Sequence, residues 1–218
     1  MKTFFLLFSI FFTTLNASSA TIKEMPIDFG KKRVELTKAY IKTHYGLKVK
    51  DITITPRIIV LHWTGSNSLK ASHSFMKRET LGGGRKDIAK ASALNVSAHY
   101  LIARDGTIYR QMPDNWMARH VIGLNYSAIG VENVGGNYNL TKAQVRANIA
   151  LVKYLKHKYP TIEYLIGHHE YKRMEATPLW LEKDKNYRTN KIDPGPKFMQ
   201  KVRAGVKELH LKTPPKGN

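Results

Sequence analysis

The chain has 218 residues and contains no cysteine, which excludes a disulfide scaffold, a zinc site built on thiolates and a cysteine nucleophile. Hydrophobic residues make up 42% and charged residues 24%, a balance typical of a globular protein and too apolar for a disordered chain. Lys and Arg number 36 against 16 Asp and Glu, so the formal charge is +20. Such a charge draws a protein to polyanions without indicating which one.

Residues 1–20 have the pattern of a secretory signal peptide. Lys2 precedes a short apolar run over residues 4–12, and Ser18 and Ala20 supply the small side chains of a cleavage site. A membrane-spanning helix needs about 20 apolar residues, so the run predicts export, with an uncleaved interfacial anchor as the alternative. We therefore expect a periplasmic or secreted protein, for which acidic envelope polymers are better candidate anions than nucleic acid.

The basic lead-in over residues 21–50 and the segment after it contain the first expected elements. Apolar residues at helical spacing predict a helix over 32–45. Residues 52–55 alternate like a short strand. The continuous run Ile58-Ile59-Val60-Leu61 predicts a strand that is buried on both faces and places His62 at its end.

Further along, strands and helices alternate. Asp105-Gly106 suits the tight turn of a hairpin, and Thr141 with Gln144 forms the capping-box pattern that opens a helix. The expected elements are a helix over 68–80, a polar loop over 82–95, a hairpin over 98–104 and 107–111, an irregular connection over 112–127, a strand over 128–134, a helix over 141–158, a strand over 164–166, a loop over 170–192 and a helix over 196–210. This alternation predicts one α/β domain over 51–211, followed by a basic disordered tail over 212–218.

Two histidines and an aspartate fall at positions where sheets commonly bind ligands. His62 and His168 follow two of the predicted strands, and Asp193 opens a sharp Pro/Gly turn. Two imidazoles and one carboxylate form a typical catalytic zinc set, and zinc lowers the pKa of water in its open position to about 7. Structural histidines at strand ends are a common alternative, and His169 is a second candidate beside His168.

The segments around these residues resemble those of zinc-dependent type 2 N-acetylmuramoyl-L-alanine amidases of the peptidoglycan-recognition-protein type. Five segments occur in that family's order within about residues 56–205: 59–65, 97–108, 125 with 128–132, 167–170 and 191–196. The resemblance implies a central mixed sheet flanked by helices in a single domain. It also implies one zinc ion bound by His62, His168 and Asp193, and cleavage of the amide between the lactyl group of N-acetylmuramic acid and L-alanine.

Two further residues take catalytic roles under this resemblance. Glu132 matches a catalytic carboxylate, and a single acid inside an apolar strand is costly unless it is paired or used. Near an activated water it would move a proton during hydrolysis. Lys191 matches a lysine that stabilises the oxyanion. The alternatives are a solvated glutamate on an edge strand and a solvated lysine.

Three residues are expected to bind substrate. His120 and Asn125 match positions that line the groove in relatives. Some phage-type relatives carry a catalytic tyrosine where this chain has Ala98. Tyr100 lies two residues later, and the alternation of side chains along a strand would place it on the same face.

Other functions remain open on the sequence alone. One alternative is a non-catalytic peptidoglycan-binding module of the same fold. Zinc content separates the two, because the enzyme should hold one zinc per chain and lose its activity when a chelator is added. A second alternative is a basic protein that acts through charge alone; it would bind any polyanion, and His62→Ala would not change its activity. A third is a zinc peptidase, which would cut within the stem peptide. The expected partners are peptidoglycan or muropeptide fragments and, through the basic surface, anionic envelope polymers. We expect a monomer and no nucleic-acid partner.

Overall fold

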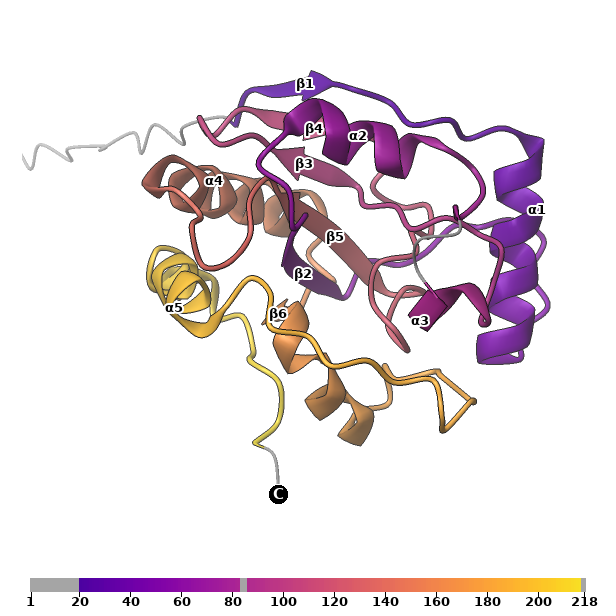
Figure 1. Cartoon of the computed structure of the whole chain (residues 1–218). Coiled ribbons are helices and arrows are strands. Elements are labelled where there is room, and N and C mark those ends of the chain that lie inside the picture. Colours follow the sequence, from indigo (N-terminus) through magenta and orange to yellow (C-terminus); the bar gives the residue numbers. More distant parts are fainter. Residues whose placement is uncertain (1–19, 83–85, 217–218) are drawn as a thin grey trace, which may run out of the picture.

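The protein is described here by a computed structural model of residues 20–82 and 86–216, so the predicted signal peptide up to residue 19 lies outside the described residues. Its centre is a six-stranded mixed sheet in the order β1-β4-β3-β5-β2-β6, with helices around it, as expected (Figure 1). The strands are β1 (Ile22–Glu24), β2 (Ile58–Trp63), β3 (Tyr100–Ile102), β4 (Ile108–Arg110), β5 (Ala128–Asn133) and β6 (Tyr164–Gly167). The helices are α1 (Lys31–Tyr40), the π-helical η1 (Ile41–Tyr45), α2 (Leu69–Lys77), α3 (Lys86–Ala89), α4 (Lys142–Lys158), the 3-10 helix η2 (His168–Ala176), α5 (Pro196–Ala204) and the 3-10 helix η3 (Lys207–Leu209).

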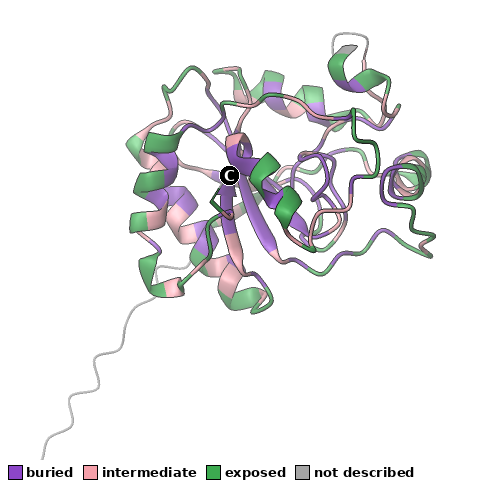
Figure 2. Cartoon of the chain, turned by 90° about the horizontal axis from the view of Figure 1, so that it is seen from below, coloured by how far each residue is buried: buried purple, intermediate pink, exposed green. Residues whose placement is uncertain are grey.

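The three central strands β5, β2 and β6 run parallel and are buried on both faces. On β2, Ile59 and Leu61 pack toward α4 and α5, whereas Ile58 and Val60 pack toward α1 and η1. Figure 2 shows the result, with buried strands inside and exposed surface on the outer faces of the helices. Since side chains alternate along a strand, His62 lies on the same face as Ile58 and Val60.

Burial on both faces explains why β2 is a continuous apolar run and not an alternating one. The carboxyl ends of β5, β2 and β6 meet at one edge of the sheet, where ligands commonly bind in α/β proteins. At that edge β2 delivers His62, β5 delivers Glu132 and β6 leads directly into His168.

The N-terminal lead-in packs into the same unit as the rest of the chain. β1 pairs in parallel with β4. β1 itself is too short and too polar to have been predicted from the sequence. The predicted helix over 32–45 is present as α1 and η1, and it ends at Gly46 in the left-handed region with φ 68°. Tyr40 and Tyr45 from this segment lie in the core beside β2.

The expected hairpin and the helix over 141–158 are confirmed. β3 and β4 pair antiparallel, and Gly106 takes a φ of 92° in the turn. Thr141 and Gln144 form the predicted capping box at the start of α4. No helix within the described residues combines the length and apolarity needed to cross a membrane.

Four expectations about secondary structure are wrong. The polar loop expected over 82–95 contains the short helix α3. Residues 52–55 form no strand, since only Thr53 makes a bridge, to Trp116. The loop expected over 170–192 begins with the continuation of η2. Residues 212–215 are not disordered, because Leu165 donates to the Lys212 carbonyl (3.0 Å) and the Arg173 guanidinium donates to the carbonyls of residues 214 and 215. The edge strand β6 has unpaired backbone groups, and the tail covers them.

Candidate metal centre

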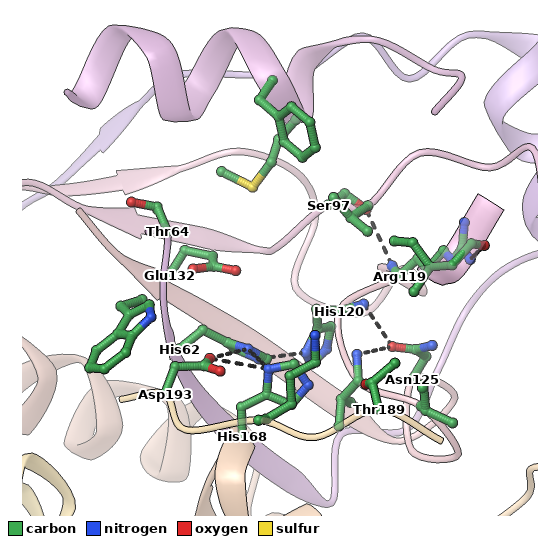
Figure 3. A pocket seen from close by; sticks show the side chains of 18 of the residues that line it. His62, Thr64, Ser97, Arg119, His120, Asn125, Glu132, His168, Thr189 and Asp193 are labelled. Carbon is green, nitrogen blue, oxygen red and sulfur yellow. Dashed lines mark hydrogen bonds and ion pairs between the residues drawn. The ribbon is translucent and has the colours of Figure 1, made fainter. Parts of the chain in front are cut away.

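The side chains of His62, His168 and Asp193 converge at the carboxyl edge of the central strands (Figure 3). His62 Nδ1 lies 2.9 Å from His168 Nδ1, and Asp193 Oδ2 lies 3.1 Å from His168 Nδ1 and 3.4 Å from His62 Nδ1. All three residues are buried. The structure therefore brings together the three predicted ligands, which come from β2, from η2 after β6, and from the turn before α5.

The spacing of these atoms fits a metal ion. Zinc bonds of about 2.0–2.1 Å in a tetrahedron hold two ligand atoms about 3.3–3.4 Å apart. The observed separations of 2.9, 3.1 and 3.4 Å are close to that edge length. Two imidazole nitrogens and a carboxylate oxygen are also donors that zinc prefers.

The electrostatics favour the protonation states that a metal requires. Burial lowers the pKa of His168 to about 4, so its imidazole is neutral at pH 7. Burial alone would raise the pKa of Asp193, but the adjacent imidazoles of His168 and His62 outweigh it and hold that pKa well below its usual range. An ionised carboxylate therefore faces a neutral imidazole, as metal binding demands.

His120 fixes the orientation of the first ligand. Its Nε2 lies 3.2 Å from the carbonyl oxygen of Ala128, which can only accept, so Nε2 carries the proton. Its Nδ1 then accepts from His62 Nε2 at 3.0 Å, which leaves His62 Nδ1 with a lone pair directed at the other two donors. Gly130 makes room for this ring, because a Cβ there would lie 2.7 Å from it.

The structure separates the two adjacent histidines. His169 Nδ1 lies 3.0 Å from the backbone carbonyl of Asp193, so this ring holds the Asp193 backbone and does not join the donor cluster. His168 is the one whose Nδ1 faces the other two donors.

Glu132 and Lys191 line the same cavity of about 430 Å³. Glu132 is the register partner of His62 on the neighbouring parallel strand, so both side chains leave the sheet on one face. Figure 3 shows the Glu132 carboxylate pointing into the cavity near His62. Lys191 precedes Asp193 by two residues and lines the cavity close enough to His168 to interact with it electrostatically. The geometry thus places an acid and a cation beside the donor cluster.

The three residues expected to bind substrate have different outcomes. His120 and Asn125 line the cavity, but Asn125 Oδ1 accepts from the backbone N–H groups of His120 and Val121, so it shapes this wall. Tyr100 is wrong as a substrate-binding residue. It is fully buried on the α4 side of the sheet, and its hydroxyl donates to Asp114 at 2.5 Å.

The error over Tyr100 has a local cause. β3 begins only at Tyr100, so strand alternation does not extend back to Ala98. Ala98 packs in a different cluster, with Leu101, and between them His99 is tied to the Gly130 N–H and the Trp116 carbonyl.

Sequence reasoning missed Glu170 as a supporting residue. Its Oε2 accepts the Gly167 N–H at 2.8 Å, and both carboxylate oxygens receive the Arg203 guanidinium. Burial raises the pKa of Glu170, but the Arg203 hydrogen bond and the Gly167 N–H outweigh it and lower that pKa overall. This carboxylate therefore anchors the turn that carries His168. The spacing of a glutamate three residues after a strand end was the available signal.

Comparisons with known proteins agree with this geometry. A family model described as N-acetylmuramoyl-L-alanine amidase matches residues 53–196. The endolysin of Klebsiella phage KP32 is 36% identical over 84 residues, which cover 35% of this chain and 55% of that protein. The chain thus matches about half the length of this curated relative.

Solved structures share the fold. The endolysin amidase LysCS from Clostridium intestinale URNW has a TM-score of 0.56 at 21% identity, covering 90% of this chain and 100% of that one. Human PGRP-IBETAC, solved with a glycosamyl muramyl pentapeptide, has a TM-score of 0.50 at 15% identity, covering 74% of this chain and 88% of that one. The expected fold is therefore confirmed.

Proposed function

The chain belongs to the family of type 2 N-acetylmuramoyl-L-alanine amidases, and from that premise we propose that it cleaves the amide between the lactyl group of N-acetylmuramic acid and L-alanine in peptidoglycan. The observation that carries the proposal is the convergence of three metal donors beside Glu132 in one cavity. A binding module needs no such set of donors next to a half-buried acid.

His62, His168 and Asp193 would hold one zinc ion. When bound, zinc supplies Lewis acidity that polarises a carbonyl and makes water a nucleophile at neutral pH. His120 keeps the first of these ligands in the tautomer that offers Nδ1, and Glu170 anchors the turn carrying the second.

Glu132 and Lys191 carry the remaining chemistry. The oxygen of a water molecule adds to the lactyl carbonyl carbon while Glu132 takes the proton that this water loses. Negative charge grows on the carbonyl oxygen, and the Lys191 ammonium opposes it. Glu132 then returns the proton to the amide nitrogen as the C–N bond breaks. The products are a lactyl carboxylate on the glycan and a free amine on L-alanine.

Export and envelope location belong to the same proposal. The signal-peptide pattern of residues 1–20 would bring the enzyme to its polymer. The formal charge of +20, to which residues 1–20 contribute only Lys2, would hold it near anionic envelope polymers.

Digestion of purified muropeptides, followed by mass spectrometry, tests the function. The wild-type protein with zinc should release intact stem peptide with a free L-alanine amine, and Glu132→Gln should reduce the rate by about 10²–10⁴-fold. Glu35→Gln, which removes an exposed acid on α1, is the matched control and should leave the rate unchanged. Fragments cut within the stem would indicate a peptidase, and binding without any cleavage would indicate a recognition module.

A further inference from the structure

A second cavity, of about 540 Å³, begins where the metal site ends. Asp193 lines the first cavity and the next residue, Pro194, lines the second, so one turn of the chain contributes to both cavities. The second cavity, here called the lysine groove, lies where α4 and α5 begin; the two helices lie together in Figure 1. Its lining includes Tyr138, Lys142, Pro194, Lys197, Phe198 and Lys201.

Tyr138 gives the lysine groove an exposed aromatic surface. Its side chain is 64% exposed, although it has a φ of 62°, which is unfavourable for a residue with a Cβ by about 1–2 kcal/mol. The ring is held on two sides. It meets the Trp63 ring edge-on at 5.1 Å between centroids, and it covers Gly195, where a Cβ would lie 2.7 Å from the ring.

Both contacts of Tyr138 lead back to the metal centre. Trp63 directly follows His62 on β2 and lines the first cavity, and Gly195 lies two residues after Asp193. The aromatic ring is therefore fixed at the boundary between the two cavities.

Three lysines give the lysine groove a positive charge. Lys142, Lys197 and Lys201 are exposed, and among residues 20–82 and 86–216 none of them forms an ion pair. Lys197 and Lys201 are four residues apart on α5, a spacing at which like charges on a helix repel. Neither α4 nor α5 has an acidic residue in its first turn to offset this charge. The groove is thus arranged for an anion.

From these features we propose that the lysine groove binds a glycan strand whose N-acetylmuramic acid residues have already lost their stem peptides. This inference rests on the proposed function, because the amidase reaction leaves a carboxylate on each lactyl group that it acts on. The flat apolar face of a pyranose ring would stack on Tyr138, and lactyl carboxylates would pair with the lysines. A stem peptide offers carboxylates but no such ring. The enzyme would then hold the product strand while the next stem reaches the metal.

Binding can be measured without any turnover. The full mature chain is titrated calorimetrically with a tetrasaccharide of alternating N-acetylglucosamine and N-acetylmuramic acid with free lactyl carboxylates. Chitotetraose, which lacks the carboxylates, and a free stem tripeptide are the comparison probes. We expect the tetrasaccharide to bind at least tenfold more tightly than chitotetraose.

Two groove variants test the contribution of the aromatic ring and that of the lysines separately. Tyr138→Asn keeps a residue that tolerates the left-handed backbone and removes the ring, and it should weaken tetrasaccharide binding about tenfold. Lys197→Gln/Lys201→Gln should weaken it similarly and make it less sensitive to salt. Lys48→Gln/Lys50→Gln removes the same charge from an exposed segment after η1 and should change binding less than twofold.

Each outcome bears on one claim. The inference is overturned by any of three results. Chitotetraose binds as tightly as the tetrasaccharide, both groove variants bind the tetrasaccharide as tightly as the wild type, or only the binding of the stem tripeptide depends on the three lysines. These results are independent of amidase activity. If tetrasaccharide binding required Tyr138 while muropeptides stayed uncut, the proposed function would fail and the glycan site would stand.

Discussion

His120 Nδ1 lies 3.0 Å from His62 Nε2, and this contact determines which nitrogen of His62 is available to a metal ion. Burial, reinforced by the neighbouring His62, lowers the pKa of His120 well below its ordinary value. His120 is therefore a neutral acceptor at pH 7 and holds the proton of His62 on Nε2. The orientation of the first ligand depends on a residue that would not itself touch the ion.

The first prediction follows from that contact. His120→Ala should lower zinc affinity by about 10–100-fold, the range typical when a hydrogen-bond partner of a metal ligand is removed. His120→Gln can still accept from His62 Nε2 and should recover part of the loss. Competition with a chromophoric chelator measures both. Unchanged affinity in His120→Ala would show that the contact does not orient His62.

Lys191 provides the second prediction. Because it would stabilise charge that develops only in the transition state, Lys191→Gln should lower kcat by about 10²–10³-fold and leave KM nearly unchanged. Lys172→Gln is the control, since Lys172 is exposed and bonds only to Asn190 Oδ1 in the described structure. A rise in KM at constant kcat would assign Lys191 to substrate binding instead.

The third prediction concerns a buried ion pair on the N-terminal segment. His44 Nδ1 lies 3.0 Å from Glu182, and its Nε2 lies 3.1 Å from the Ala91 carbonyl, so the ring donates from both nitrogens. Burial alone would lower the pKa of His44, but these hydrogen bonds outweigh it and raise the pKa above 6.5. The groups facing the ring are Glu182, Arg119, Tyr40 and Tyr187.

The sign of the pH effect follows from this raised pKa. The pair should contribute fully to stability below about pH 6.5, and the contribution should be lost as pH rises through the raised pKa of His44. Removing one partner of a buried pair costs about 3–5 kcal/mol, so Glu182→Gln should be strongly destabilised at pH 6 and less so at pH 9. Urea unfolding at both pH values measures this.

Asp114→Asn is the matched control for the buried pair. Asp114 is equally buried but pairs with Lys158 at 2.6 Å, whose pKa is raised from 10.5. Its destabilisation should be the same at pH 6 and pH 9. Equal pH dependence in the two variants would contradict a charged His44.

The sequence predicted the parts of the fold that depend on strong local patterns. The continuous apolar run predicted that β2 is a strand buried on both faces, and the capping-box pattern predicted the start of α4. β1 escaped prediction because it has three residues, two of them charged, and is stabilised by pairing with β4. Such tertiary pairing leaves no periodicity to find.

The candidate site was predictable where residues stand at strand ends, and less so elsewhere. His62 lies near the end of β2 and His168 directly follows β6, and the structure places both together with Asp193. Tyr100 was misplaced because β3 begins only at Tyr100, two residues after Ala98, so the alternation does not link the two positions. His120 sets the tautomer of His62 because its own Nε2 contacts the Ala128 carbonyl and because Gly130 leaves room for its ring. No spacing of residues along the chain indicates either contact.

The central claim is that His62, His168 and Asp193 bind one catalytic metal ion. Equilibrium dialysis of the folded protein against chelator-buffered zinc tests it most directly. We predict one zinc per chain for the wild type and at least a 100-fold weaker affinity for Asp193→Ala at equal helix content. A wild-type protein that binds no zinc, or an Asp193→Ala variant that binds it equally well, would contradict the account.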